Sequence, residues 1–120
     1  MSKILVQLVT GPENTTRAAL ALLVARTAAT DGHDVTVFLA GDAVNFFRPE
    51  TLDAAHGVGT GSLREHYTAL VEAGVPFLGS GMSSKARGID ASVIGEKAVE
   101  LVPPSRLVEL IAQADQVVTY

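Results

Sequence analysis

The amino-acid sequence predicts a single α/β domain built around a mostly parallel sheet, and three observations support this. Short apolar runs rich in β-branched residues alternate along the chain with longer segments of helical character, which is the order of elements in a parallel α/β fold. Several of these runs are continuously apolar, as in strands that are buried on both faces. The length of 120 residues suits one domain, so we expect residues 1–120 to share one core.

The first half of the chain opens with a strand–helix–strand unit. Residues 3–9 and 35–40 are the two apolar strands, and the crossover between them should be right-handed. The helix between them spans residues 16–30 and is mostly Ala, Leu and Val, with Arg17 and Arg26 as its charged residues. Its apolar surface is therefore wider than one stripe. We expect one face to pack on the sheet and part of another to pack on a neighbour.

The rest of the chain continues the alternation. A capping box, Ser62-Leu63-Arg64-Glu65, opens a helix that ends at Gly74. The glycine-rich residues 57–61 do not follow a strand, so they fail the test for a nucleotide-binding loop, and we expect them to be mobile. The other predicted elements are short helical turns over residues 43–47, 51–56 and 89–94, strands over 75–78, 98–102 and 116–120, a loop over 79–88, and a last helix that begins at 103–105.

The composition restricts the class of protein. Hydrophobic residues make up 48% and charged residues 18%, so the chain is more apolar than a typical domain, and a subunit interface is the natural place for the excess. No apolar run approaches the roughly 18 residues of a membrane span. Met1-Ser2-Lys3 leads directly into a strand with no secretory signal, and we expect a cytoplasmic protein. The net charge of -4 argues against nucleic-acid binding, which needs a basic surface.

The candidate site follows from the predicted sheet. Ligands of open parallel sheets bind beyond the carboxyl ends of the strands, where loops 11–16 and 79–88 should lie. Both loops are rich in Gly, Ser and Thr, and their backbone N–H groups at helix starts favour an anion. The alternative is that these residues only form turns and helix caps. The candidate ligand-binding residues are Gly11, Asn14, Thr15, Gly79, Ser80, Gly81, Ser83, Lys85 and Arg87.

Other chemistry finds little support in the sequence. No cysteine is present, which excludes disulfides, thiolate metal ligands and thiol nucleophiles. His33, His56 and His66 lack the i, i+4 spacing of a zinc-binding helix. Ser80 lies in no Gly-x-Ser-x-Gly elbow and has no evident base. We therefore predict no metal, no cofactor and no catalytic residue.

Four segments carry a resemblance to a known family: residues 8–12 (Leu-Val-Thr-Gly-Pro), 31–34 (Asp-Gly-His-Asp), 85–89 (Lys-Ala-Arg-Gly-Ile) and 114–118 (Ala-Asp-Gln-Val-Val). In this order and spacing the chain resembles the DsrE/DsrF-like proteins of sulfur-relay systems over nearly its whole length. The resemblance implies a five-stranded, mostly parallel sheet with helices on both faces, a three-layer α/β/α arrangement of flavodoxin-like topology. It also implies homo- or hetero-oligomers, often trimers or hexamers built from trimers.

The resemblance does not bring the family's best-known activity with it. Active members carry a cysteine in the loop after the third strand, which accepts sulfur as a persulfide, and that position corresponds to Ser80 here. A serine hydroxyl cannot hold transferable sulfur. We therefore expect a non-catalytic homo-oligomer, a trimer or hexamer, that binds a partner protein or a small anionic ligand at the loop after the third strand. The alternatives are a structural subunit of a larger assembly and a cysteine-independent enzyme that uses the same crevice.

Overall fold

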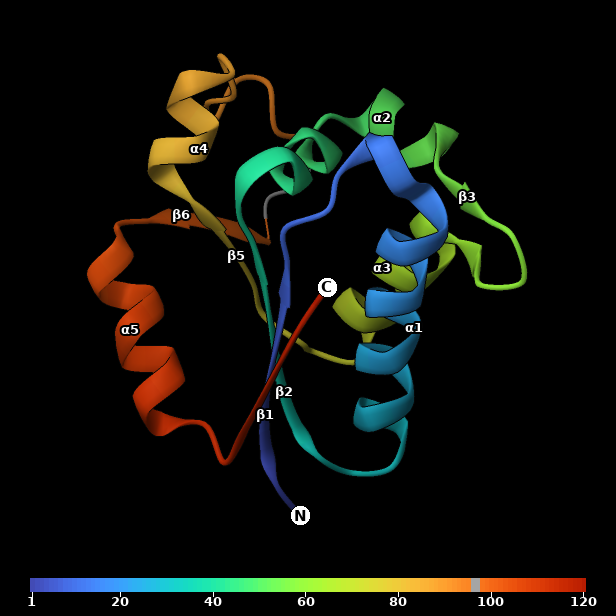
Figure 1. Cartoon of the computed structure of the whole chain (residues 1–120), viewed down its shortest axis with the longest axis vertical. Helices are drawn as coiled ribbons and strands as arrows, with labels where there is room; N and C mark the ends of the chain where they lie inside the picture. The colour runs from blue at the N-terminus through green and yellow to red at the C-terminus, as the bar shows by residue number, and fades with distance from the viewer. Residues whose placement is uncertain (96–97) are drawn as a thin grey trace.

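A five-stranded parallel sheet forms the centre of the molecule, with the strands in the order β6-β5-β2-β1-β7 (Figure 1). The computed structural model describes residues 1–95 and 98–120. Within them every neighbouring pair of strands in this sheet is parallel, which confirms the predicted fold class. The strands are β1 (Lys3–Leu8), β2 (Asp34–Leu39), β5 (Phe77–Ser80), β6 (Val99–Val102) and β7 (Gln116–Thr119).

Helices cover both faces of this sheet. The helical elements are η1 (Pro12–Asn14), α1 (Thr15–Thr30), η2 (Gly41–Phe47), α2 (Pro49–Ala54), α3 (Leu63–Glu72), α4 (Gly81–Ala86) and α5 (Pro104–Gln113). Helices α1 and α3 lie on one side of the sheet and α5 lies on the other (Figure 1). None of the helices in the described chain has the length and apolar character that a membrane span requires.

The wide apolar surface of α1 is explained within the chain. The buried residues of α1 are small, apart from one leucine, so a neighbouring helix can approach closely. That neighbour is α3, which contacts α1 along its length and contributes buried residues of its own. Part of the second apolar face of α1 therefore packs against α3 of the same chain, while Leu20 of α1 stays 37% exposed.

The strand expected over residues 75–78 begins two residues later, because Val75 is part of the hydrogen-bonded turn that follows α3. Its N–H donates to the carbonyl of Leu70 at 3.0 Å, and Gly74 takes a φ of 80°, which a glycine adopts freely at the end of a helix. Strand β5 therefore includes Gly79 and Ser80. The expected loop over residues 79–88 is instead the end of β5 followed by α4.

Two other segments differ from their expected form. Residues 57–61 lie in a hairpin of two short antiparallel strands, β3 (His56–Gly57) and β4 (Gly61–Ser62). The hairpin is tied to α1, because the hydroxyl of Thr16 accepts from the Val58 N–H at 3.0 Å and the Thr60 hydroxyl donates to the Thr16 carbonyl at 3.0 Å. The helix expected over residues 89–94 is a turn. There the Asp90 carboxylate accepts backbone N–H groups that a helix would use internally.

Candidate functional site

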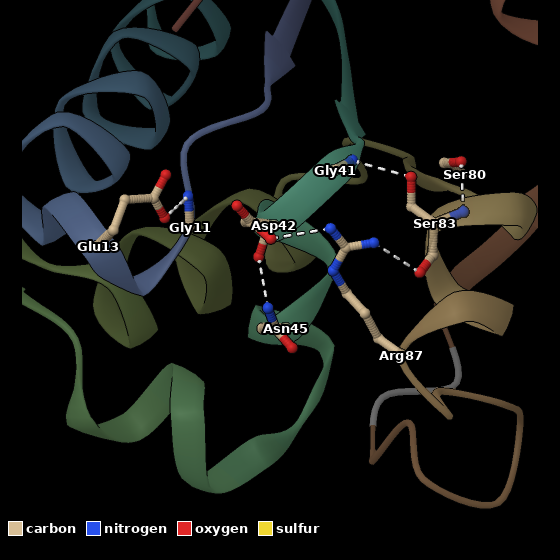
Figure 2. A network of polar contacts seen from close by, with 8 residues as sticks. All are labelled: Gly11, Glu13, Gly41, Asp42, Asn45, Ser80, Ser83 and Arg87. Atoms are coloured by element: carbon tan, nitrogen blue, oxygen red, sulfur yellow. Dashed lines mark hydrogen bonds and ion pairs between the residues drawn. The ribbon is translucent and has the colours of Figure 1, made fainter.

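The carboxyl ends of β1, β2 and β5 meet at one end of the sheet, and the predicted site residues follow these strands. The segment after β1 contains Gly11, the segment after β2 is η2, and the segment after β5 is α4. Hydrogen bonds join these last two segments directly, as Figure 2 shows. Segment η2 lies between the segments that follow β1 and β5 and contacts both η1 and α4.

Ser80 acts as the cap of α4. Its side-chain oxygen accepts a hydrogen bond from the backbone N–H of Ser83 at 3.1 Å, which is the usual role of a serine at the start of a helix. In the described part of the chain, no titratable side chain forms a hydrogen bond with this hydroxyl. Activation of Ser80 as a nucleophile would require such a base.

Arg87 closes the other end of α4. One guanidinium nitrogen, Nη1, donates to the carbonyl of Ser83 at 3.0 Å, and Nη2 donates to Oδ1 of Asp42 at 2.8 Å (Figure 2). This partner lies in η2 of the same chain, so the charge of Arg87 is balanced internally. Both side chains are partly exposed, at 31% for Arg87 and 58% for Asp42, and such a pair stabilises a protein by only about 0–1 kcal/mol.

Ser83 joins α4 to the end of β2. Its Oγ accepts a hydrogen bond from the N–H of Gly41 at 3.0 Å, and Asn45 supports the same segment by donating from Nδ2 to the Asp42 carbonyl at 2.9 Å. The hydroxyl of Ser83 and the guanidinium of Arg87 therefore hold the segment after β2 against α4. Both groups are committed to this contact.

The glycines of the site permit close packing of the main chain. A Cβ atom on Gly11 would lie 2.3 Å from the carbonyl oxygen of Asp42, and one on Gly79 would lie 2.4 Å from the ring of Phe47. Real side chains do not reach such distances, so both positions require glycine. A Cβ atom on Gly81 would lie 3.3 Å from the Val102 carbonyl oxygen, which is tight. Gly11 is thereby brought to η2, whereas Gly79 is buried beneath it.

Asn14 and Thr15 take structural roles at the start of α1. The Asn14 side chain accepts from the Arg17 N–H at 3.0 Å and caps the helix. The Thr15 hydroxyl donates to the carbonyl of His56 at 2.9 Å and so binds the β3–β4 hairpin. Neither forms a hydrogen bond with η2 or α4 in the described chain. The cap at Asn14 agrees with the alternative that these residues form turns and helix caps.

The exposed side of α4 carries Met82 and Lys85. Met82 is 69% exposed. Lys85 is also exposed, and its ammonium group makes no hydrogen bond or ion pair with any residue that the structure describes. Of the nine predicted residues, Lys85 is therefore the one whose charge is available to a ligand or partner. The structure places it apart from the internal contacts of Arg87.

Two residues of this region, Asp42 and Arg48, were not among the predicted site residues. Asp42 binds Arg87, and the Arg48 Nη2 donates to the Arg87 carbonyl at 3.0 Å. A signal for Asp42 was present, since Gly41-Asp42 directly follows a strand and so lies at the same edge of the sheet. Arg48 carried no such signal, because it lies nine residues beyond the end of β2 at Leu39.

The histidines do not form a shared site. His33 Nδ1 accepts from the Ser2 N–H at 2.9 Å. His66 is buried, and its Nε2 donates to the Thr60 carbonyl at 2.7 Å while its Nδ1 accepts from Arg26 at 3.4 Å. Within residues 1–95 and 98–120, no group of three or more His, Cys, Asp or Glu side chains is placed to hold a metal ion.

Comparisons with known proteins agree with one another. A family model described as the DsrE/DsrF-like family matches residues 2–120. Among solved structures, the ychN protein from E. coli is similar with a TM-score of 0.82 at 22% identity, and the comparison covers 100% of both chains. A protein of unknown function from Methanobacterium thermoautotrophicum, MTH1491, is similar with a TM-score of 0.77 at 14% identity, again over 100% of both chains.

A third solved structure extends the likeness. The protein of unknown function BT1422 from Bacteroides thetaiotaomicron has a TM-score of 0.70 at 13% identity, over 98% of this chain and 95% of that chain. No curated protein matches the chain significantly. At these identities the structural likeness establishes the fold.

Proposed function

The chain belongs to the DsrE/DsrF-like family, and on that premise we propose that it is a non-catalytic, homo-oligomeric member that binds a partner through the exposed side of α4. The observation that carries the proposal is the division of α4 into two sides. Ser83 and Arg87 face η2 and are held there by hydrogen bonds, whereas Met82 and Lys85 face solvent.

The groups on the exposed side of α4, Met82 and Lys85, favour a partner protein over a small anion. A small-anion site is best served by an unpaired cation, but the Arg87 guanidinium is already bound to Asp42 and to the Ser83 carbonyl. The Ser80 and Ser83 hydroxyl oxygens accept hydrogen bonds within the chain, so only their O–H groups remain as donors. What remains is an exposed thioether beside an ammonium group, and methionine is common on adaptable protein-binding surfaces. A partner with a small apolar patch next to a carboxylate would match Met82 and Lys85.

The absence of cysteine from the sequence separates this chain from persulfide chemistry. Ser80, at the position that the family resemblance gives to the sulfur-accepting cysteine, uses its hydroxyl to cap α4. The same fold thus retains the end of β5 and α4 as a rigid surface while the nucleophile is missing. A binding role uses that surface without any reaction at Ser80.

Exposed apolar side chains on α5 and β7 support the proposed homo-oligomer. Neither α5 nor β7 contains a buried residue, and three of their apolar side chains are exposed: Val108 by 63%, Ile111 by 42% and Val117 by 40%. Apolar surface of this kind is usually covered in an assembly. A trimer or hexamer in which these side chains are covered would account for the high apolar content of the sequence.

Site-specific photo-crosslinking in cells tests the partner. A photo-reactive amino acid replaces Met82 in one variant and Glu72, an exposed residue of α3, in a control variant. We expect a discrete crosslinked protein from position 82 that is absent from position 72 and is lost when Lys85→Glu is added. Identical products from both positions, or none from position 82, would contradict partner binding at α4.

Native mass spectrometry of the protein from its own source tests the assembly. We expect three or six copies, with the partner retained. An intact oligomer whose position 82 crosslinks to nothing would instead favour a purely structural subunit. If isothermal calorimetry detected binding of inorganic sulfate that required Lys85, the occupant would be a small anion.

A further inference from the structure

A groove of about 190 Å³ lies between α5 and the beginnings of β1 and β2, at the opposite end of the sheet from α4. Its polar lining comes from Lys3 of β1, Asp34 and Thr36 of β2, and Arg106 and Gln113 of α5. The groove is smaller than the roughly 300–1,000 Å³ of pockets for drug-sized ligands. It therefore suits a small metabolite.

The walls of the groove are held in place by the main chain. The Lys3 N–H donates to Oδ2 of Asp115 at 2.7 Å, and the Asp115 N–H donates to the Lys3 carbonyl at 2.8 Å, which ties the end of α5 to β1. On the other wall the Asp34 N–H donates to the Ser2 carbonyl at 2.9 Å. A site with fixed walls loses little conformational freedom when a ligand binds.

Opposite charges stand side by side in this groove. Lys3 and Asp34 are direct partners in the β1–β2 register, so their side chains leave the same face of the sheet from strands about 4.8 Å apart. Yet within the described chain the Lys3 ammonium and the Asp34 carboxylate form no ion pair. Arg106 adds a second cation. Its Nη1 donates to Glu109 Oε2 at 3.2 Å, and its Nε and Nη2 donors have no partner in the described chain and remain for a ligand.

The floor of the groove is apolar. Leu5 is 2% exposed, and Leu110 of α5 packs on the same small cluster. A ligand that fits this lining carries a carboxylate for the cations, an ammonium for Asp34 and a short apolar group for the floor. We propose that the groove binds a small zwitterion, an α-amino acid with an aliphatic side chain, its carboxylate at Lys3 and Arg106 and its ammonium at Asp34.

The presence of Asp34 separates this proposal from a simple anion site. A carboxylate beside the two cations would repel an inorganic anion, whereas it complements the ammonium of a zwitterion. The neutral side chains of Thr36 and Gln113 supply further hydrogen-bonding groups around the charges. The groove does not involve α4, so its test is independent of the partner-binding site proposed there.

A titration of the ¹⁵N-labelled full chain with L-leucine, followed by amide NMR shifts, tests the site. We expect saturable shifts at Leu5, Thr36 and Leu110. Loss of one charge-assisted hydrogen bond should weaken binding about tenfold or more, both for Asp34→Asn and for Arg106→Gln. Glu72→Gln, which makes the same charge change as Asp34→Asn on the other side of the sheet, should leave the affinity unchanged.

Two analogues test the same point on the native protein, so the result does not depend on how well a variant folds. L-Leucinamide lacks the carboxylate and 4-methylpentanoate lacks the ammonium, and each should bind about tenfold or more weakly than L-leucine. Equal binding of the three molecules, shifts confined to other regions, or no saturable shift with L-leucine would overturn the proposal.

Discussion

On one face of the sheet, α1 and α3 lie together and supply buried side chains to a large apolar core. On the other face, α5 covers a small cluster formed by Leu5, Phe38, Leu78 and Val102, and no residue of α5 itself is buried. The same sheet is therefore closed within the chain on one side and left partly open on the other. The stability of the monomer should come mainly from the first face, and contacts with other molecules from the second.

The largest expected effect lies in the α1–α3 core. Phe77 is 1% exposed and its ring centroid lies 4.6 Å from that of Tyr67 in α3. Phe77→Ala should lower the free energy of unfolding by about 3–5 kcal/mol, since it removes buried apolar surface and leaves a cavity. Urea unfolding followed by circular dichroism measures the change.

Ile111→Ala on α5 is the matched control for this comparison. Ile111 is 42% exposed, so in the monomer its truncation should change the free energy of unfolding by no more than about 0.5 kcal/mol. Equal losses from the two substitutions, measured on dilute monomer, would show that the two faces do not differ as described.

The next prediction concerns the open face itself. Ile111→Glu should convert the oligomer proposed above to a monomer with a native circular dichroism spectrum, because the new carboxylate would be buried without a partner in the interface. Light scattering coupled to gel filtration measures the mass. Val58→Glu is the control, since Val58 is 88% exposed but lies at the β3–β4 hairpin; an unchanged mass for Ile111→Glu would place the interface elsewhere.

The sequence predicted the sheet well because its strands are continuous apolar runs whose character does not depend on their partners. The candidate site was predicted less completely. Ser80, Ser83 and Arg87 were found from their position after a strand, but Asp42, the partner of Arg87, is 45 residues away, and no local pattern indicates such a contact. The helix α4 was missed because its six residues are mostly small and polar, and its form depends on the Ser80 cap and the ties to η2.

The open face was indicated by composition but not located by it. The excess of apolar residues predicted an interface, and α1 was the helix expected to pack on a neighbour. In the structure α3 covers part of that surface and leaves Leu20 37% exposed. Helix α5, whose pattern is more clearly amphipathic, leaves Val108 and Ile111 exposed to a greater extent. Only the packing of helices that are distant in sequence decides which apolar stripe is covered.

Burial alone does not determine how much a side chain stabilises the fold, and Ser84 is an example. Ser84 is as buried as Phe77, with 0% exposure, but its hydroxyl has no hydrogen-bond partner among the residues that the structure describes. Ser84→Ala should therefore raise the free energy of unfolding by about 1 kcal/mol, since it removes a desolvated polar group. Ser83→Ala is the control and should be destabilising, because its Oγ binds the Gly41 N–H; a loss of stability for Ser84→Ala would mean that its hydroxyl is satisfied in solution.

The smallest expected effect comes from the opposite extreme, the exposed Asp90. Hydrogen bonds from the Ser92 side chain, and then from the Ser92 and Val93 backbone, hold the pKa of Asp90 below its ordinary value of 3.8. Because the pKa is lower in the folded chain than in the unfolded chain, the stabilisation is present above pH 3.8 and is lost as the pH falls through the folded value.

Asp90→Asn keeps a carbonyl acceptor but cannot titrate, so the stability difference from the native protein should shrink on acidification, as measured by urea unfolding at a series of pH values. Glu72→Gln, which removes another exposed carboxylate, controls for the change in net charge, and the same pH dependence in both variants would mean that the turn at Asp90 contributes nothing of its own.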